Sequence, residues 1–431
     1  MAIVQTLRDA WKIPSIRNKI GFTLLMLLVF RIGAHIPIPF MDRTLLTEMM
    51  GGSGGILDFF NTFSGGSLKR FSVFALSIMP YITASIIIQL LTVVIPHLER
   101  LSKEGDEGRK KIVQYIRYAT VVFGFINGLG LTIGLRGALV IPDESLRIPI
   151  YLMIALVLTA GTAFLMWLGE QITEHGIGNG ISLIIFAGIV AAVPDAVKYL
   201  IGLLKVGEIS YFAILGLIII AAAIIAGVVY IQEGQRRIPV QYAKRVVGRR
   251  VYGGQSSHIP LKVNQAGVIP IIFGISLMAF PATIASWMPS TSGFSLFVQK
   301  WMTMNGSLQS IPYLTMYALL IIFFTYFYTG ITFNPVDVAE NLKKYGGFIP
   351  GIRPGRPTSD YMFKILSRVT LAGGLFLALI AILPSMVIGL TGIQNIYLGG
   401  TSLLIVVSVA LETMKQIEAQ LMQRHYQGFL K

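Results

Sequence analysis

The side chains best suited to chemistry are few in this sequence and lie far apart. The segment GIGNG at 176–180 has the glycines of a phosphate cradle, but it follows no β-strand and lacks the G-x-G-x-x-G spacing. Glu174 and His175 precede it, yet there is no H-E-x-x-H motif and the histidines are scattered. Cysteine is absent, which excludes disulfides, thiol metal sites and cysteine nucleophiles. We therefore expect no enzyme, no metal and no cofactor, and we interpret 176–180 as a tight turn between helices.

A second set of polar side chains is neutral and lies at apolar stretches. Gln89 and Thr92 belong to the stretch 71–95, and Asn264 precedes another. They would serve either as ordinary hydrogen bonds between membrane helices, worth about 0.6 kcal/mol each, or as a polar seam between two helices that must part reversibly. The residues alone leave both explanations open.

Ten apolar stretches make up the elements that must position these side chains. Each meets or approaches the roughly 20 residues that a helix needs to cross hydrocarbon. They run over 18–36, 71–95, 112–135, 148–169, 181–203, 210–232, 267–288, 311–333, 367–388 and 397–416. Apart from Lys19, Lys198, Arg368 and Lys415, which we assign to the flanking segments, only Arg31 and Arg117 are basic inside them, both near an end, and we expect every aspartate in a loop or at the end of a stretch. The pattern predicts an all-α polytopic membrane protein.

The distribution of lysine and arginine predicts the orientation of the chain. Of 35 basic residues, 25 lie in the terminal and loop segments on one side and 8 on the other. The positive-inside rule then places both termini in the cytoplasm. A composition of 54% hydrophobic and only 13% charged residues agrees with a membrane protein.

Two segments at the start of the chain lie outside this regular pattern. Residues 1–17 have an apolar face with Leu7, Trp11 and Ile13, typical of an amphipathic helix on the cytoplasmic surface. The external segment 37–70 contains GGSGG, a flexible hinge, followed by a short apolar helix over 56–66. This helix either folds back into a cavity of the protein or packs as a re-entrant helix on the outer headgroups.

Two large basic loops lie on the cytoplasmic side. Loop 233–262 has β-prone runs with glycine turns and predicts a small hairpin. Loop 334–368 predicts a short helix through Lys344, a tip built from glycine and proline, and a helical lead-in to the next stretch. Their charge would serve contact with anionic lipid headgroups or the docking of an acidic or RNA-bearing partner.

The ten stretches divide into five and five, over 18–205 and 206–431. An odd number of spans in each part gives the two halves opposite orientations, as in inverted repeats, although no repeat is visible residue by residue. A secondary solute transporter of this kind is therefore an alternative, but it requires polar or ionisable residues at mid-membrane, and these are nearly missing. A helix-packing scaffold without transport is a second alternative.

Several long strings resemble the SecY family, the channel-forming subunits of the bacterial Sec protein translocon. They include FSGGSLKRFSVFALSIMPYITASIIIQLL, YAKRVVGRRVYGGQSSHIPLKVNQAGVIP and NLKKYGGFIPGIRPG. The similarity extends in order over essentially the whole chain. It implies ten transmembrane helices in two inverted halves around a central hourglass pore, with a plug helix and a lateral gate.

The resemblance also implies roles for named residues. The pore ring would comprise Ile78, Ile82, Ile181, Ile185, Ile272 and Ile405. The plug, within 56–66, would include Ile56, Leu57, Phe59, Phe60 and Phe63. The lateral gate would include Gln89, Thr92 and Asn264. The docking positions for the SecA ATPase or the ribosome would be Arg236, Arg237, Arg249, Arg250, Lys343, Lys344, Arg353 and Arg356.

The implied function is passage of unfolded secretory proteins across the bacterial plasma membrane, with lateral release of hydrophobic segments into lipid. The implied partners are SecE, SecG, SecA, the ribosome, signal-bearing precursors and anionic lipids, and DNA is not among them. Branched apolar side chains suit such a pore, because they close around any passing chain and exclude water when it is absent. The sequence has no nucleotide site, so a partner would supply the energy.

Overall fold

The computed structural model describes residues 8–42, 44–46, 61, 64–207, 209–242, 245–247, 250–252, 256–288, 292–301, 311–391 and 400–428. The long helices are α2 (Pro14–Gly33), α5 (Met79–Val94), α7 (Asp106–Gly134), α8 (Arg147–His175), α9 (Gly180–Val206), α10 (Tyr211–Glu233), α11 (Ile269–Trp287), α13 (Ile311–Thr332), α15 (Arg356–Thr391) and α16 (Gly400–Gly428). The short helices are α6 (Pro96–Lys103), α12 (Gly293–Trp301), α14 (Pro335–Lys344), η1 (Arg136–Ala138) and η2 (Glu144–Leu146). The strands are β1 (Gln235–Tyr242), β2 (Arg245–Val247), β3 (Arg250–Tyr252), β4 (Ser256–Lys262) and β5 (Gly347–Phe348).

Each of the ten expected stretches overlaps one long helix. Within the part of the chain that the structure describes, six helices or helix pairs are long and apolar enough to cross a membrane: α7, α8 with η2, α9, α10, α13 with α14, and α15. The number rises to seven if α5 and α6, bent by 100° at their junction, form one broken span. Membrane-spanning helices are therefore confirmed, whereas ten spans stay a prediction.

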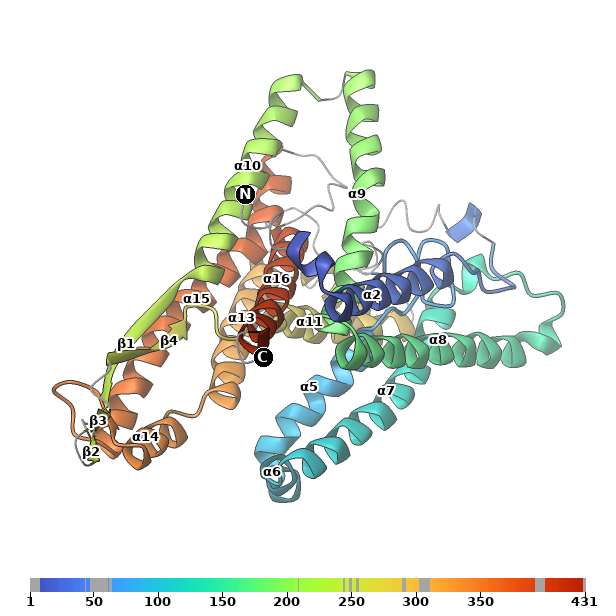
Figure 1. The fold of residues 1–431 in the computed structure, drawn as a ribbon. Helices are drawn as coiled ribbons and strands as arrows, with labels where there is room; N and C mark the ends of the chain where they lie inside the picture. Colours follow the sequence, from blue (N-terminus) through green and yellow to red (C-terminus); the bar gives the residue numbers. More distant parts are fainter. Residues whose placement is uncertain are drawn as a thin grey trace.

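The long helices lie in two groups (Figure 1). One group contains α2, α5, α7, α8 and α9, the other contains α10, α13, α15 and α16, and α11 lies between them. The helices α5, α6 and α7 extend from the body as an arm, while α14 and the strands lie at the far end of the second group. Helix α11 contacts α5 and α7 on one side and α13 on the other, so it joins the two groups.

One large apolar core connects both groups. Its buried residues include Phe30 of α2, Leu165 of α8, Val228 of α10, Phe324 of α13 and Leu404 of α16. Many apolar side chains on the outer faces are exposed instead, such as Phe212 at 85% and Ile218 at 60% on α10. Apolar residues on both faces of a helix are expected where lipid replaces water as the surrounding medium.

The stretch 71–95 differs from the expected single helix. Only Met79–Val94 is helical, and the residues before it form turns in which Phe71 and Ser77 have positive φ angles of 45° and 52°. Pro80 occupies the first turn of α5, where its missing N–H costs nothing. Pro96 then begins α6. Proline thus limits the helix at both ends.

The predicted N-terminal helix is present in the described part of 1–17. Residues 8–12 are helical, and Ala10 and Ile16 are buried against Ile417 and Leu421 of α16. Trp11 is 55% exposed. The segment therefore packs partly on the protein, and Leu7 lies outside the described residues.

Candidate functional site

The six isoleucines expected to form a pore ring come together in the large core. Ile78, Ile82, Ile185, Ile272 and Ile405 are 1%, 5%, 2%, 7% and 0% exposed, and Ile181 packs, partly buried, against the same core. They come from four places in the chain: the start of α5, the first turns of α9, the start of α11 and the start of α16. The six side chains thus belong to one apolar core, and their role as a pore ring stays a prediction.

Local sequence features position these isoleucines. Ile78 is the residue before α5, which Pro80 begins. The Asn179 side chain caps α9 by accepting hydrogen bonds from the backbone N–H groups of Ile181 and Ser182 at 3.1 and 3.3 Å. Such a cap stabilises the first turn of the helix, which holds Ile181. Helix starts thus determine where the ring side chains lie.

The plug residues predicted at 56–63, from Ile56 to Phe63, all lie outside the described residues. The end of the segment is described, and there Ser64 and Ser67 are fully buried. The Arg31 side chain of α2 donates a hydrogen bond to the carbonyl oxygen of Gly65 at 2.8 Å. A Cβ atom added to Gly65 would lie 3.1 Å from Cα of Gly188 in α9. The end of the segment, at Gly65, therefore packs beside α2 and α9.

The polar residues expected at a lateral gate bond within their own segments. Gln89 donates to the Ser85 hydroxyl at 3.1 Å, and the Thr92 hydroxyl donates to the carbonyl of Gln89 at 2.6 Å. The Asn264 amide donates to the carbonyl of Gly267 at 2.9 Å, while its buried oxygen has no partner. A Cβ on Gly373 of α15 would lie 3.8 Å from Cα of Asn264. Gln89 and Asn264 therefore form no direct bond between them.

The contact between α5 and α11 uses other side chains. The Ser276 hydroxyl of α11 lies 3.8 Å from the sulfur of Met79 at the start of α5 and donates to the carbonyl of Ile272 at 2.8 Å. A contact with a thioether sulfur is weak. Apolar packing therefore dominates where these two helices meet.

The two basic loops form one small unit. Strand β1 pairs antiparallel with β4 of the same loop and with β5 of the other loop, which gives the order β4-β1-β5. A separate core of Ile238, Val240, Leu342, Ile349 and Met362 binds the sheet to α14 and α15. The hairpin, the short helix and the lead-in predicted from the sequence are thus confirmed. Sequence reasoning missed the pairing between the loops.

This unit holds the predicted docking residues on its surface. Arg236, Arg237, Lys343, Lys344, Arg353 and Arg356 are exposed, whereas Arg249 and the side chain of Arg250 lie outside the described parts. Gly351 and Gly355, with φ of 81° and 104°, turn the chain on either side of Arg353. The Thr358 hydroxyl donates to the carbonyl of Arg353 at 2.8 Å. The backbone of the tip is therefore held in place, and the Arg353 side chain is exposed on it.

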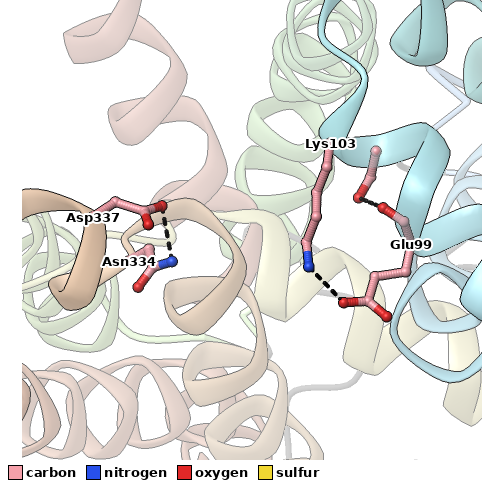
Figure 2. Close-up of polar contacts among 5 residues, drawn as sticks. Glu99, Lys103, Asn334 and Asp337 are labelled. Carbon is pink, nitrogen blue, oxygen red and sulfur yellow. Dashed lines mark hydrogen bonds and ion pairs between the residues drawn. The ribbon is translucent and has the colours of Figure 1, made fainter.

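Helix α6 and the start of α14 each have a polar pair of their own (Figure 2). The Lys103 ammonium lies 2.7 Å from the Glu99 carboxylate, and the Asn334 amide donates to the Asp337 carboxylate at 2.8 Å. The Lys103 ammonium lowers the pKa of the Glu99 carboxyl. Each pair is exposed and stays within one helix, so neither joins the two helices, and exposed pairs contribute little stability.

Glu170 has a partner that the sequence does not predict, and Asp195 lies where no aspartate was expected. Glu170 of α8 accepts a bidentate pair of hydrogen bonds from Arg117 of α7, at 3.0 and 2.8 Å, and this pairing could not be predicted because the two residues are far apart in the chain. Asp195 lies inside α9 and not at its end, with its side chain 73% exposed and 3.8 Å from Lys198. Among the described residues, no cluster of three or more His, Asp or Glu side chains has the arrangement of a metal site.

The SecY family model matches residues 72–414. The chain belongs to the SecY family. One relative is the protein translocase subunit SecY of Halalkalibacterium halodurans, 51% identical over 99% of this chain and 100% of the relative.

Solved structures share the fold of this SecY family member. A structure described as "The plug domain of the SecY protein stablizes the closed state of the translocation channel and maintains a membrane seal" superposes with a TM-score of 0.66 at 19% identity, covering 93% of this chain and 91% of that one. Another, "Sec61 in the Canine ribosome-channel complex from the endoplasmic reticulum", has a TM-score of 0.63 at 19% identity, with coverage of 93% and 91%. These likenesses establish the fold across distant relatives.

Proposed function

We propose that the chain forms the pore of a protein-conducting channel. Unfolded secretory proteins would cross the bacterial plasma membrane through it, and hydrophobic segments would leave it sideways into lipid. The observation on which this mainly rests is that six isoleucines from the starts of α5, α9, α11 and α16 all belong to the one apolar core that connects the two groups of helices. Isoleucine is stiff and branched, with no polar atom to bind a passing chain.

The proposed seal works by excluding water. An apolar constriction raises the free energy of water inside it, so ions do not follow when no polypeptide is present. Plug residues Ile56, Leu57, Phe59, Phe60 and Phe63 would close the pore from the external side. The buried end of their segment at Ser64 and Gly65 supports that placement.

The proposed lateral gate lies where α11 meets α5 and α7. Contact between these helices is apolar and includes the weak pair of Ser276 and Met79. Gln89, Thr92 and Asn264 would border the opening, since they bond within their own segments and do not join the two sides. Parting the helices would then break few polar bonds.

The energy for transport would come from partners. SecA or the ribosome would dock on the unit of β1, β4, β5 and α14, because its exposed basic side chains suit an acidic or RNA-bearing surface. SecE and SecG would cover exposed apolar helix faces such as that of α10. Anionic lipids would contact the cytoplasmic cations, and both termini would be cytoplasmic. The chain itself would perform no catalytic step.

The docking role can be tested at one position. Arg353→Glu reverses the charge on the rigid tip, and we expect partner-driven precursor transport to fall about tenfold, while the protein still inserts into the membrane. Lys205→Glu, at the far end of α9, is the matched control. Equal transport by both variants would show that Arg353 only contacts lipid headgroups.

The channel itself is tested by reconstitution into sealed vesicles. ATP-dependent entry of a signal-bearing precursor in the presence of SecA supports the proposal. Uptake of a small solute coupled to an ion gradient would instead support a secondary transporter. Failure of both would support a packing scaffold.

A further inference from the structure

The turn at 176–180 is bound from three sides. The N–H of Ile177 donates to the Thr23 hydroxyl of α2 at 3.1 Å, and the N–H of Gly180 donates to the Thr173 hydroxyl of α8 at 2.9 Å. Between them, the N–H of Gly178 donates to the side-chain oxygen of Gln416 in α16 at 2.9 Å. The turn thus links α2, α8 and α9, on one side of the molecule, to α16 on the other.

The glycines of this turn allow the close approach. Gly178 has a φ of 90°, which other residues rarely adopt. A Cβ atom there would lie 2.9 Å from Leu183 and 3.1 Å from the Thr413 hydroxyl of α16. A Cβ on Gly176 would lie 2.5 Å from the Thr23 hydroxyl. The glycines thus have a packing role, and no phosphate is needed to explain them.

Apolar side chains surround the contact between the 176–180 turn and Gln416 of α16, which we call the junction. Ile177, at the centre of the turn, is 3% exposed, and it lies in a cluster with Ala10, Ile16, Ile417 and Leu421. Gln416 therefore accepts its hydrogen bond beside a water-poor cluster. A hydrogen bond in such a place is costly to leave unmade.

The contact between the 176–180 turn and Gln416 joins α9 to α16. Both helices also supply isoleucines of the proposed ring. On α16, Gln416 comes about three turns after Ile405, which puts both on nearly the same face. On α9, Ile181 and Ile185 lie in the first two turns after the bound turn. A shift of the turn against α16 would therefore move the isoleucines of α9 relative to Ile405.

We propose that Gln416 is a positioning residue: through Gly178 it fixes α9 against α16 and so holds the apolar ring closed. This inference rests on the proposed function. The polypeptide passing through would widen the ring, and the junction would return α9 to its resting place.

The test measures resting ion conductance of the full chain in planar bilayers. Gln416→Leu keeps the size of the side chain and removes the acceptor. We expect its leak to rise roughly fivefold, the factor that corresponds to losing one neutral hydrogen bond. Gln416→Glu keeps an oxygen acceptor and should stay as tight as the parent. Gln423→Leu, at an exposed position of the same helix, is the matched control.

A second readout separates positioning from general stability. Because the chain has no native cysteine, spin labels can be placed specifically at Glu174→Cys and Lys415→Cys, two exposed positions beside the junction. Gln416→Leu should broaden the distance distribution between the labels, and Gln416→Glu should not. If Gln416→Leu fails to fold, Gln416→Asn, which is too short to reach Gly178, replaces it.

The outcomes are distinct. If the parent protein transports no precursor, the proposed function is wrong. If instead the parent transports precursor while the Gln416→Leu variant has the same ion leak and label distances as the parent, only the role proposed for Gln416 is wrong. A leak in Gln416→Glu equal to that of Gln416→Leu would likewise overturn the role given to the acceptor.

Discussion

At Ile405 the side chain is completely buried, although the residue is expected to line a passage. It packs within the large core, together with Ile78, Ile82, Ile185 and Ile272. If these residues form the proposed seal, they serve both the stability of the protein and the closure of the pore. Substitutions there must therefore be read with the amount of folded protein held constant.

A polar substitution in the ring should open a path for ions. Ile82→Ser together with Ile405→Ser changes one residue from each group of helices. Hydroxyl groups stabilise water in the constriction, so resting conductance should rise at least several-fold. Each change should also cost roughly 2–5 kcal/mol of stability, as for other large-to-small substitutions in a core. Planar-bilayer recording measures the leak.

The control is Ile218→Ser with Ile219→Ser on the exposed face of α10, where the side chains are 60% and 59% exposed. These changes make the same chemical replacement away from the ring. If the ring variant leaks no more than this control, the isoleucines are not the seal.

The ion pair of Arg117 and Glu170 should stabilise the packing of α7 on α8. Arg117→Met leaves the Glu170 carboxylate, whose side chain is only 20% exposed, without its partner. We expect a loss of about 1–3 kcal/mol in the free energy of unfolding. Arg117→Met with Glu170→Met should recover most of it, since no uncompensated charge remains.

A double-mutant cycle in the unfolding free energy measures this coupling. Lys103→Met removes the cation of an exposed pair with Glu99 and should change nothing measurable. Additive effects of the Arg117 and Glu170 changes would contradict the prediction.

At the scale of elements, the sequence predicts what periodicity and charge control. All ten apolar stretches contain a helix, and the hairpin and short helix of the basic loops lie where glycine, proline and β-prone runs indicate. What the sequence does not reveal depends on contacts between distant segments. Residues 71–78 are apolar enough for a helix, yet they form turns, because the backbone of Val73 packs closely against Gly161 of α8. The pairing of β1 with β5 and the bond from Gly178 to Gln416 are hidden for the same reason.

The contact of α8 with residues 71–78 can be tested through one glycine. A Cβ atom on Gly161 would clash with the carbonyl oxygen of Val73. Gly161→Ala should therefore lower the free energy of unfolding by about 1–3 kcal/mol, as overpacking in a core does. Thermal unfolding in detergent provides the measurement.

Gly202→Ala in α9 is the matched control, since nothing lies within 4 Å of its added Cβ atom. Alanine is the better helix former by about 1 kcal/mol, so this variant should be equally stable or more stable. A Gly161→Ala protein that unfolds at the parental temperature would show that 71–78 moves aside easily.

At the scale of the whole molecule, two groups of helices share one core and meet through α11 and α16. The contact through α11 is mostly apolar among the described residues and includes the weak polar pair of Met79 and Ser276. The contact through α16 includes the hydrogen bond that the N–H of Gly178 donates to the side-chain oxygen of Gln416. This difference suits a molecule that opens along α11 and stays joined near the 176–180 turn.

Joining the two groups covalently at α11 should therefore stop transport. Cysteines at Met79 and Ser276, whose side chains touch in the resting structure, can be linked by oxidation or by a short bis-maleimide. We expect the linked protein to bind a signal-bearing precursor but to translocate less than a tenth as much, because α5 and α11 must separate. Reduction of the disulfide should restore transport, and each single cysteine under the same oxidant should behave like the parent. Full transport by the linked protein would mean that the channel opens without parting these helices, and the proposed lateral gate would then have to lie elsewhere.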